Sequence, residues 1–385
     1  MYGRFVAEEG SFYFKNSYEN SVLYGLFQIH FGGSYLNFWA NICTVLATIP
    51  KLEYAPLVTV YLNLILKIFF IYFIFKSDSL ILKNFLYKYL FALILIASPS
   101  NVPEVWLNSI NAQSYFGLFT IILFFTDFSK KNYIHKYSTY ILILSGLTSL
   151  YSCVLTPFFY FKYKFYKNKF DLRNFFALLA TTIIQGSILI YSKLNNLAWS
   201  VRHELSFEKI INFYYNVIVK SIVGRENAHL IIDLVKSIDM KILFLLFSFL
   251  LLILIFFLFS YFYKKKDKIF YFLFCFFIAE SVLILIGSHY DQAGGRYAVV
   301  PGIIILLIII KLTQENSKLL KISSFFLIFL SISSGLYEFK NRNINKNFLL
   351  CNDCPVWKEE IKIWRSNPNY KIKIWNYPGE LMKLN

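Results

Sequence analysis

Long apolar runs separated by short basic gaps are the feature that most limits how this chain can fold. The 385 residues are 57% hydrophobic and 20% aromatic, and only 16% are charged. A soluble domain could not bury that much apolar side chain, so lipid is the expected solvent for most of the chain. We predict an all-α polytopic membrane protein, with apolar runs near residues 56–75, 86–98, 113–126, 137–161, 174–192, 241–263, 269–288, 297–310 and 322–337.

The basic residues predict how these runs are oriented. The net charge is +17, but Lys and Arg fall in short gaps between the runs, which indicates a membrane surface and no nucleic acid as their partner. The positive-inside rule places the basic gaps on the cytoplasmic face only if 137–161 crosses twice and turns back at a break near Ser145–Ser149. This gives about ten crossings from residue 56 onward, with both ends on the outer face. The gaps in question are 76–88, 127–136, 162–173, 264–268 and 311–321.

Three regions follow from this topology. Residues 1–55 form an outer-face segment, in which 11–31 should be an irregular amphipathic stretch and 34–49 an interfacial helix too short to span. Residues 56–337 form the transmembrane domain with a large outer loop at 193–240, and 338–385 form an outer-face tail. An outer N-terminus requires one more crossing upstream, so we expect a first membrane helix, ahead of residue 1, to be missing from this sequence.

The polar residues worth explaining gather on the outer face. Glu8 and Glu9 are adjacent carboxylates, which we expect to be equally exposed. A carboxylate at the membrane surface can act on the polar part of a lipid-linked substrate, whereas the plainer interpretation is an acidic pair on an ordinary loop. Glu104, Asn108 and Asn111 lie in the segment 99–112, which is either a solvated loop or a second polar wall of the same site.

Basic residues on the same face are candidates for holding an anion. Arg202 follows the end of a run, where lipid phosphate groups lie, and the planar fork of Arg suits phosphate. Arg296 and Tyr297 open another run, and an arginine at a helix N-terminus opposes the helix dipole, which favours a bound anion there. Lys51 follows the interfacial helix. The plainer interpretation of these residues is contact with lipid headgroups.

Other notable residues receive no role from the sequence. Lys67 and Glu280 lie within apolar runs, where ionisable groups are functional candidates by default. Cys351 and Cys354 form a single C-x-x-C motif. A structural zinc site needs about four ligands, so this pair favours a local disulfide or two unpaired thiols over a metal site. The sequence contains no P-loop, dinucleotide-binding, metalloprotease or serine-elbow motif. It therefore offers no recognisable site for a reaction with soluble nucleotides.

Taken in order, these residues resemble the integral-membrane glycosyltransferases of the GT-C superfamily. That group includes lipid-A aminoarabinose transferases and protein O-mannosyltransferases, and the resemblance is greatest to bacterial members. It extends over nearly the whole chain apart from the family's first transmembrane helix. The matching fragments are Arg4…Glu8-Glu9-Gly10…Phe12, Gly33-Ser34-Tyr35-Leu36, Tyr54-Ala55-Pro56, Glu104…Asn108…Asn111, Leu144-Ser145-Gly146-Leu147, Arg296-Tyr297…Pro301 and Trp357…Trp364…Pro378-Gly379.

The resemblance implies a multi-pass enzyme of the bacterial cytoplasmic membrane with its active site on the outer face. Such an enzyme transfers a sugar from a polyprenyl phosphate or diphosphate carrier to a glycan, lipid or protein acceptor, with inversion at the sugar carbon. It implies that Glu8 is the catalytic base, with Glu9 beside it; the family's acid is often Asp, so Glu8 is a departure. The implied carrier-phosphate ligands are Arg202, Arg296, Tyr297 and Lys51, and the implied substrate-binding residues are Glu104, Asn108 and Asn111.

Metal dependence and two other function classes stay open. Some relatives use a divalent metal, for which Glu9 and Glu104 are the candidate ligands. An O-antigen or capsule polymerase also has many spans and functional arginines, but it would have a dominant late outer loop. A flippase of lipid-linked sugars would need a polar path across the bilayer and often internal repeats. The acidic pair in the first outer segment favours the transferase.

Overall fold

The computed structural model describes residues 4–100, 105–128, 134–197, 207–228, 230, 262, 267–288, 295–341, 355–375 and 381–384. Over these residues the chain is almost wholly helical, which confirms the predicted all-α class. The chain divides into two compact units. Unit 1 comprises Met1–Ser79, Val102–His203 and Asn343–Asn385, and unit 2 comprises Leu80–Asn101 and Glu204–Arg342.

Five helical segments in the described part of the chain are long and apolar enough to cross a membrane, and a bent helix pair could be a sixth. The shortest of the five has 18 residues. At about 1.5 Å per residue such a helix covers roughly 27 Å, close to the hydrocarbon thickness of a bilayer. The structure therefore agrees with the predicted membrane protein. The five segments are Leu52–Lys76, Lys169–Leu194, Lys268–Gly287, Gly295–Leu312 and Lys318–Lys340.

Two of the predicted crossings are short helices. The run 86–98 is α5 (Phe85–Ala97), of 13 residues, and the run 113–126 is α6 (Gln113–Phe124), of 12 residues. Helix α5 ends because Ser98 is extended and Pro99 follows, and α6 is preceded by a short 3₁₀ turn, η4 (Ile110–Ala112). Each is shorter than the roughly 20 residues of a typical span. The run 241–263 lies almost entirely outside the described residues, so ten crossings stay a prediction.

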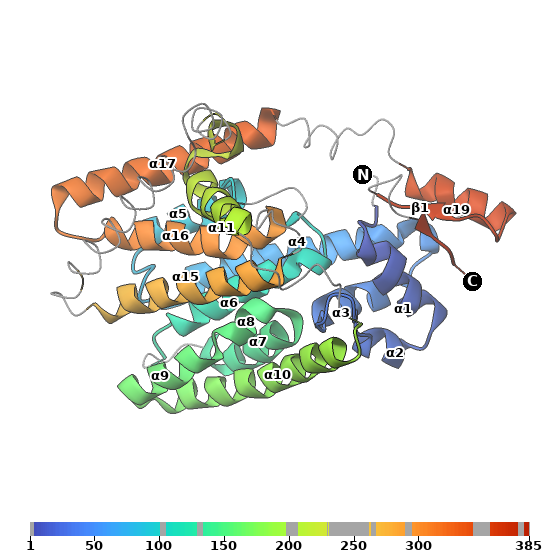
Figure 1. Cartoon of the computed structure of the whole chain (residues 1–385), viewed down its shortest axis with the longest axis horizontal. Coiled ribbons are helices and arrows are strands. Elements are labelled where there is room, and N and C mark those ends of the chain that lie inside the picture. The colour runs from blue at the N-terminus through green and yellow to red at the C-terminus, as the bar shows by residue number, and fades with distance from the viewer. Residues whose placement is uncertain are drawn as a thin grey trace. The chain divides into compact units, whose positions relative to one another are not determined.

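The predicted break inside 137–161 is confirmed. Helix α7 (Ile134–Thr148) ends at Ser149, which is extended, and α8 (Leu150–Val154) and α9 (Thr156–Tyr166) leave at an angle of 114°. Helix α10 (Lys169–Leu194) runs beside all three (Figure 1). A Cβ at Gly146 would lie 2.0 Å from Oγ1 of Thr181, so only glycine allows α7 to approach α10 this closely.

Gln185 of α10 joins the bend to the N-terminal segment. Its side-chain oxygen accepts from the N–H of Leu36 at 3.0 Å, and its Nε2 donates to the carbonyl of Leu36 at 2.9 Å. The same Nε2 lies 3.1 Å from the carbonyls of Gly146 and Leu147. A buried amide is costly unless its polar atoms are paired, and Gln185 meets this demand by fixing residue 36 against the bend.

The predicted irregular stretch 11–31 consists of short helices. These are the π-helix η1 (Glu9–Phe14), α1 (Lys15–Glu19) and α2 (Val22–Phe27). Helix α2 exposes Val22, Leu23, Tyr24 and Phe27, which is typical of a helix lying at a membrane interface. Helix α3 (Phe38–Ala47) follows with ten residues, so it is about 15 Å long and cannot span a bilayer.

The C-terminal tail packs against the start of the chain. It contains α19 (Trp357–Ser366) and a two-stranded antiparallel sheet of β1 (Ile372–Lys373) and β2 (Leu381–Met382), with Ile372 opposite Met382. The indole N–H of Trp357 donates to the carbonyl of Leu52 at 2.8 Å, and the N–H of Trp375 donates to the carbonyl of Phe5 at 3.1 Å. Figure 1 shows α19 and β1 beside the N-terminal helices of unit 1.

Unit 2 is built around α16 (Val299–Leu312), which is buried along most of its length. It packs against α15 (Lys268–Gly287), α17 (Lys318–Asn341) and α5. Its Lys311 forms ion pairs with Asp267 at 2.7 Å and Glu315 at 3.0 Å. The predicted outer loop 193–240 is not all loop: its described part contains α11 (Phe207–Phe213), η5 (Tyr214–Val219) and α12 (Lys220–Val223).

Candidate functional site

The two carboxylates of the acidic pair have different environments. Ala7 takes a left-handed φ of 48°, and the chain then turns into η1, which begins at Glu9. This turn directs Glu9 into unit 1, where it is 1% exposed, whereas Glu8 is only half-buried. The expectation that the two residues are equally exposed is therefore wrong.

Glu9 is bound by a residue that the sequence did not single out. The backbone N–H of Ser109 donates to Oε1 of Glu9 at 3.0 Å, and the Ser109 hydroxyl donates to the same oxygen. Burial raises the pKa of the Glu9 carboxyl, while the hydrogen bonds from Ser109 and from Thr59 act in the opposite direction. Cys43 of α3 is near enough that, after burial, the charge of Glu9 also raises the pKa of its thiol.

The turn that carries Ser109 is packed inside unit 1. Asn108 and Asn111 are 4% and 2% exposed, and Oδ1 of Asn108 accepts from the N–H of Ile110 at 2.8 Å. Nδ2 of Asn37 donates to the carbonyl of Ile110 at 2.9 Å. The described part of 99–112 is therefore packed and is not a solvated loop, and its role as a second polar wall of the site stays a prediction. Leu107 has a left-handed φ of 55°, a strain of about 1–2 kcal/mol that the surrounding hydrogen bonds sustain.

A row of polar residues follows the buried face of α4 (Ala55–Lys76). Thr59, Asn63 and Lys67 are spaced by four, so they share one face of the helix, and none is more than 9% exposed. Oδ1 of Asn63 accepts from the indole N–H of Trp39 at 3.0 Å. Neither this row nor a role for Lys67 was predicted from the sequence. The spacing of four within an apolar run is the signal that could have revealed it.

Lys67 is a buried lysine whose amine lies against two aromatic rings. Its Nζ lies 3.9 Å from the centre of the Trp106 ring and 4.7 Å from that of Tyr115, and it has no hydrogen-bond acceptor within the described residues. A cation–π contact contributes about 0.5–2 kcal/mol. Burying an ion costs several kcal/mol even after relaxation. The rings alone therefore do not offset the burial of this charge, and an anion beside Nζ would stabilise it.

The remaining predicted residues are placed as follows. Lys51 is exposed in unit 1, at the turn before η2 (Leu52–Tyr54). Arg296 and Tyr297 lie in η6 (Gly295–Ala298) of unit 2, with the guanidinium carbon 5.4 Å from the centre of the Tyr297 ring. Glu104 and Arg202 lie outside the described residues, as do Cys351 and Cys354.

The described residues do not form a metal site. No group of three or more His, Cys, Asp or Glu side chains able to hold a metal ion occurs among them. Of the two predicted ligands, Glu104 is not described and Glu9 is engaged by Ser109 through Oε1. A single carboxylate does not satisfy a divalent cation, which takes six or more oxygen ligands if it is magnesium or calcium.

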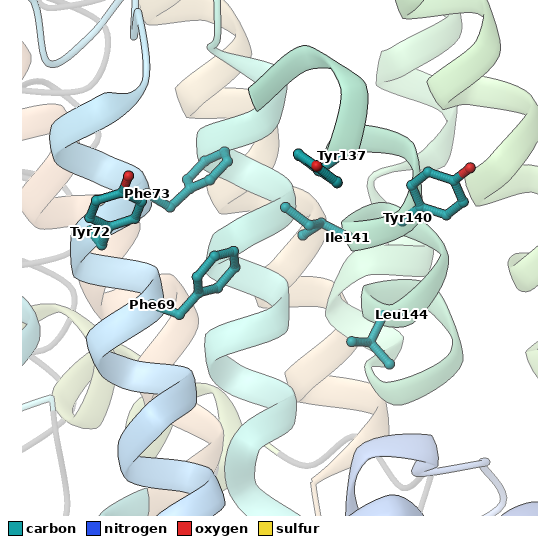
Figure 2. Close-up of a pocket in the computed structure, with 7 residues that line it drawn as sticks. All are labelled: Phe69, Tyr72, Phe73, Tyr137, Tyr140, Ile141 and Leu144. Carbon is teal, nitrogen blue, oxygen red and sulfur yellow. The ribbon is translucent and has the colours of Figure 1, made fainter. Parts of the chain in front are cut away.

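An apolar groove of about 390 Å³ lies between α4 and α7. Figure 2 shows side chains from the two helices lining it: Phe69, Tyr72, Phe73, Tyr137, Tyr140, Ile141 and Leu144. The lining residues include neither a carboxylate nor a cation. The apolar walls of the groove suit hydrocarbon chains.

Comparison with protein-family models, with curated proteins and with solved structures finds no match to this chain.

Proposed function

We propose that this chain is a membrane glycosyltransferase that moves a sugar from a polyprenyl phosphate or diphosphate carrier to an acceptor at the outer face of the membrane. The observation that carries the proposal is the difference between Glu8 and Glu9. Glu9 is buried and bound by Ser109, while Glu8, the next residue, keeps an accessible side chain. One carboxylate is thus fixed in the fold, and its neighbour is available to a substrate.

In the proposed reaction Glu8 is the general base. Its carboxylate accepts the proton of an acceptor hydroxyl or amine as that atom attacks C1 of the sugar. The bond between C1 and the carrier phosphate oxygen breaks, and its electron pair leaves with the phosphate. Attack from the side opposite the leaving group inverts C1. Glu9 is a positioning residue, because its bonds to Ser109 hold the start of η1 beside the turn at 105–112.

The experiment that tests this function is Glu8→Gln in purified enzyme supplied with a polyprenyl-linked sugar. Glutamine preserves size and hydrogen bonding but removes basicity, so transfer should fall by about a hundredfold or more. Binding of the carrier should change little. Glu9→Gln is the matched control, with the same chemical change and a smaller expected loss of transfer. Wild-type turnover by the Glu8→Gln enzyme would contradict the assignment.

The proposal includes the orientation derived from the basic gaps: about ten crossings, with both ends outside the cytoplasm. Lys167, in the gap between α9 and α10, is exposed and should be cytoplasmic. Lys358, exposed on α19, should lie on the outer face. Single cysteines at these positions, in a chain without its native cysteines, should react with a membrane-impermeant reagent on opposite sides. Labelling of both from one side would disprove this topology.

A further inference from the structure

Lys67 has hydrogen-bonding capacity that the described fold does not use. Its ammonium carries three donors, is buried on a membrane-crossing helix, and finds no acceptor in the described part of the chain. Its Nζ lies over the faces of the Trp106 and Tyr115 rings. Ionisable groups at such positions need a partner, and this one lacks a partner from the described residues.

The position of Lys67 relates it to the acidic pair. Thr59, which lies close enough to Glu9 to lower the pKa of its carboxyl, is eight residues before Lys67 on the same face of α4, or about 12 Å along the helix axis. The turn that binds Glu9 through Ser109 also carries Trp106 against Lys67. One wall of unit 1 therefore connects Glu9, the neighbour of the proposed base, to Lys67. In an inverting displacement the base and the leaving group lie on opposite sides of the reacting carbon, so a cation offset from the base suits the leaving group.

We infer that Lys67 binds the phosphate of the lipid-linked sugar donor. The residues predicted for this role from the sequence were Arg202, Arg296, Tyr297 and Lys51. When the bond from C1 to the phosphate oxygen breaks, the electron pair stays on that oxygen, and the ammonium donates a hydrogen bond to the resulting oxyanion. Trp106 and Tyr115 present their ring faces to Nζ, so both rings would border the bound phosphate. The inference rests on the proposed transfer reaction for the identity of the lipid.

Binding of undecaprenyl phosphate to the protein in phosphatidylcholine nanodiscs tests the inference without any sugar transfer. Lys67→Met should weaken binding about ten- to a hundredfold, the effect of losing a hydrogen bond to a charged group. Lys67→Arg, which preserves the charge, should retain binding to within about tenfold. Lys76→Met is the matched control, since Lys76 lies on the same helix but is exposed, and its affinity should equal that of the wild type. Unchanged affinity in Lys67→Met would overturn the inference.

Stability without the ligand distinguishes a binding lysine from a structural one. Lys67→Met removes a buried amine that has no hydrogen-bond acceptor among the described residues, so the ligand-free protein should melt at the same or a higher temperature than the wild type. A lower melting temperature of Lys67→Met would indicate that Lys67 has a structural role, through its contacts with Trp106 and Tyr115. Coupling between Lys67→Met and Glu104→Gln in a ligand-free double-mutant cycle would identify a partner within the chain. Either result would overturn the inference.

Two further measurements are needed. One distinguishes the lipid-linked donor from general anionic lipid as the source of the phosphate, and the other distinguishes failure of the phosphate site from failure of the transferase proposal. A Lys67-dependent stabilisation by phosphatidylglycerol equal to that by undecaprenyl phosphate would assign the site to general anionic lipid and overturn the donor role. If the wild-type protein transfers no sugar but binds the carrier in a way that depends on Lys67, the transferase proposal is rejected and the phosphate site is retained. Transfer by Lys67→Met with unchanged kcat and KM would reject the site and retain the transferase.

Discussion

Ser109 donates two hydrogen bonds to one oxygen of Glu9, across a separation of 100 residues in the chain. This contact joins the N-terminal segment to the turn before α6. The same turn places Trp106 over Lys67, so the acidic pair, the turn and the buried ammonium are parts of one packed structure. A change at Ser109 should therefore affect both the stability of unit 1 and the arrangement of the proposed site.

We predict that Ser109→Ala destabilises the protein by about 1–3 kcal/mol. The substitution removes the hydroxyl donor and leaves an oxygen of the buried Glu9 with the backbone N–H alone. Unfolding in mixed micelles measures the loss. Ser187→Ala is the control, because the Ser187 hydroxyl is exposed and bonds only the carbonyl of Ile183 within its own helix. Equal effects of the two substitutions would show that the contact with Glu9 contributes nothing.

Glu9 should make the stability depend on pH. Its pKa in the folded protein is raised above the ordinary value of 4.5, mainly by burial. Below 4.5 both the folded and the unfolded states hold the proton. As the pH rises from 4.5 through the folded-state pKa, the unfolded state releases its proton first, so the free energy of unfolding falls.

The measurement is the unfolding free energy of wild type and Glu9→Gln across this range of pH. Glutamine does not titrate, so the part of the slope that belongs to Glu9 should disappear. Ser109→Ala removes a bond that lowers the pKa, so it should extend the decline to higher pH. Parallel profiles for wild type and Glu9→Gln would exclude Glu9 as the titrating group.

The fold class could be predicted from the sequence because apolar runs and helix-breaking residues act locally. The break near Ser149 was predictable because the run 137–161 contains Ser and Gly in its middle and basic gaps at both ends. The bounds of α6 follow its apolar run at 113–126 to within two residues, but the run does not reveal whether so short a helix crosses the membrane. The number of crossings therefore depends on packing that periodicity does not describe.

The candidate site was predictable only in part. Two adjacent glutamates are visible in the sequence, but their different burial results from the left-handed turn at Ala7 and the contact with Ser109. No local pattern links residues 100 positions apart. Lys67 was visible as a charge in an apolar run, but the lack of an acceptor for its ammonium among the described residues is a tertiary fact.

Gly146→Ala should destabilise the bend by about 1–3 kcal/mol or more. The new methyl group would lie 2.0 Å from Oγ1 and 2.7 Å from Cβ of Thr181, so α7 and α10 would have to separate. Gly186→Ala on α10 is the matched control, because its Cβ meets no atom within 4 Å. There the alanine should be neutral or stabilise the helix by up to about 1 kcal/mol. Thr181→Gly should recover part of the loss in Gly146→Ala, and a failure to do so would place the strain elsewhere.

The last prediction concerns the tail, which should hold the acidic pair in place. Trp357 is 3% exposed, meets the Phe5 ring edge-on at 5.0 Å, and donates to the carbonyl of Leu52. Phe5 lies three residues before Glu8, so loosening this cluster should loosen the pair. Trp357→Ala should cost about 3–5 kcal/mol locally and speed hydrogen exchange at residues 5–14.

Trp364 provides the comparison, because it is on the same helix α19 but only partly buried at the edge of the cluster. Trp364→Ala removes the same side chain with less contact area, so exchange at residues 5–14 should rise less than in Trp357→Ala. Transfer activity should fall in the same order, since Glu8 can act as a base only while the segment before it is held. If Trp357→Ala opens the tail to proteolysis but leaves exchange at residues 5–14 and transfer unchanged, then the tail packs on the N-terminal segment without positioning it.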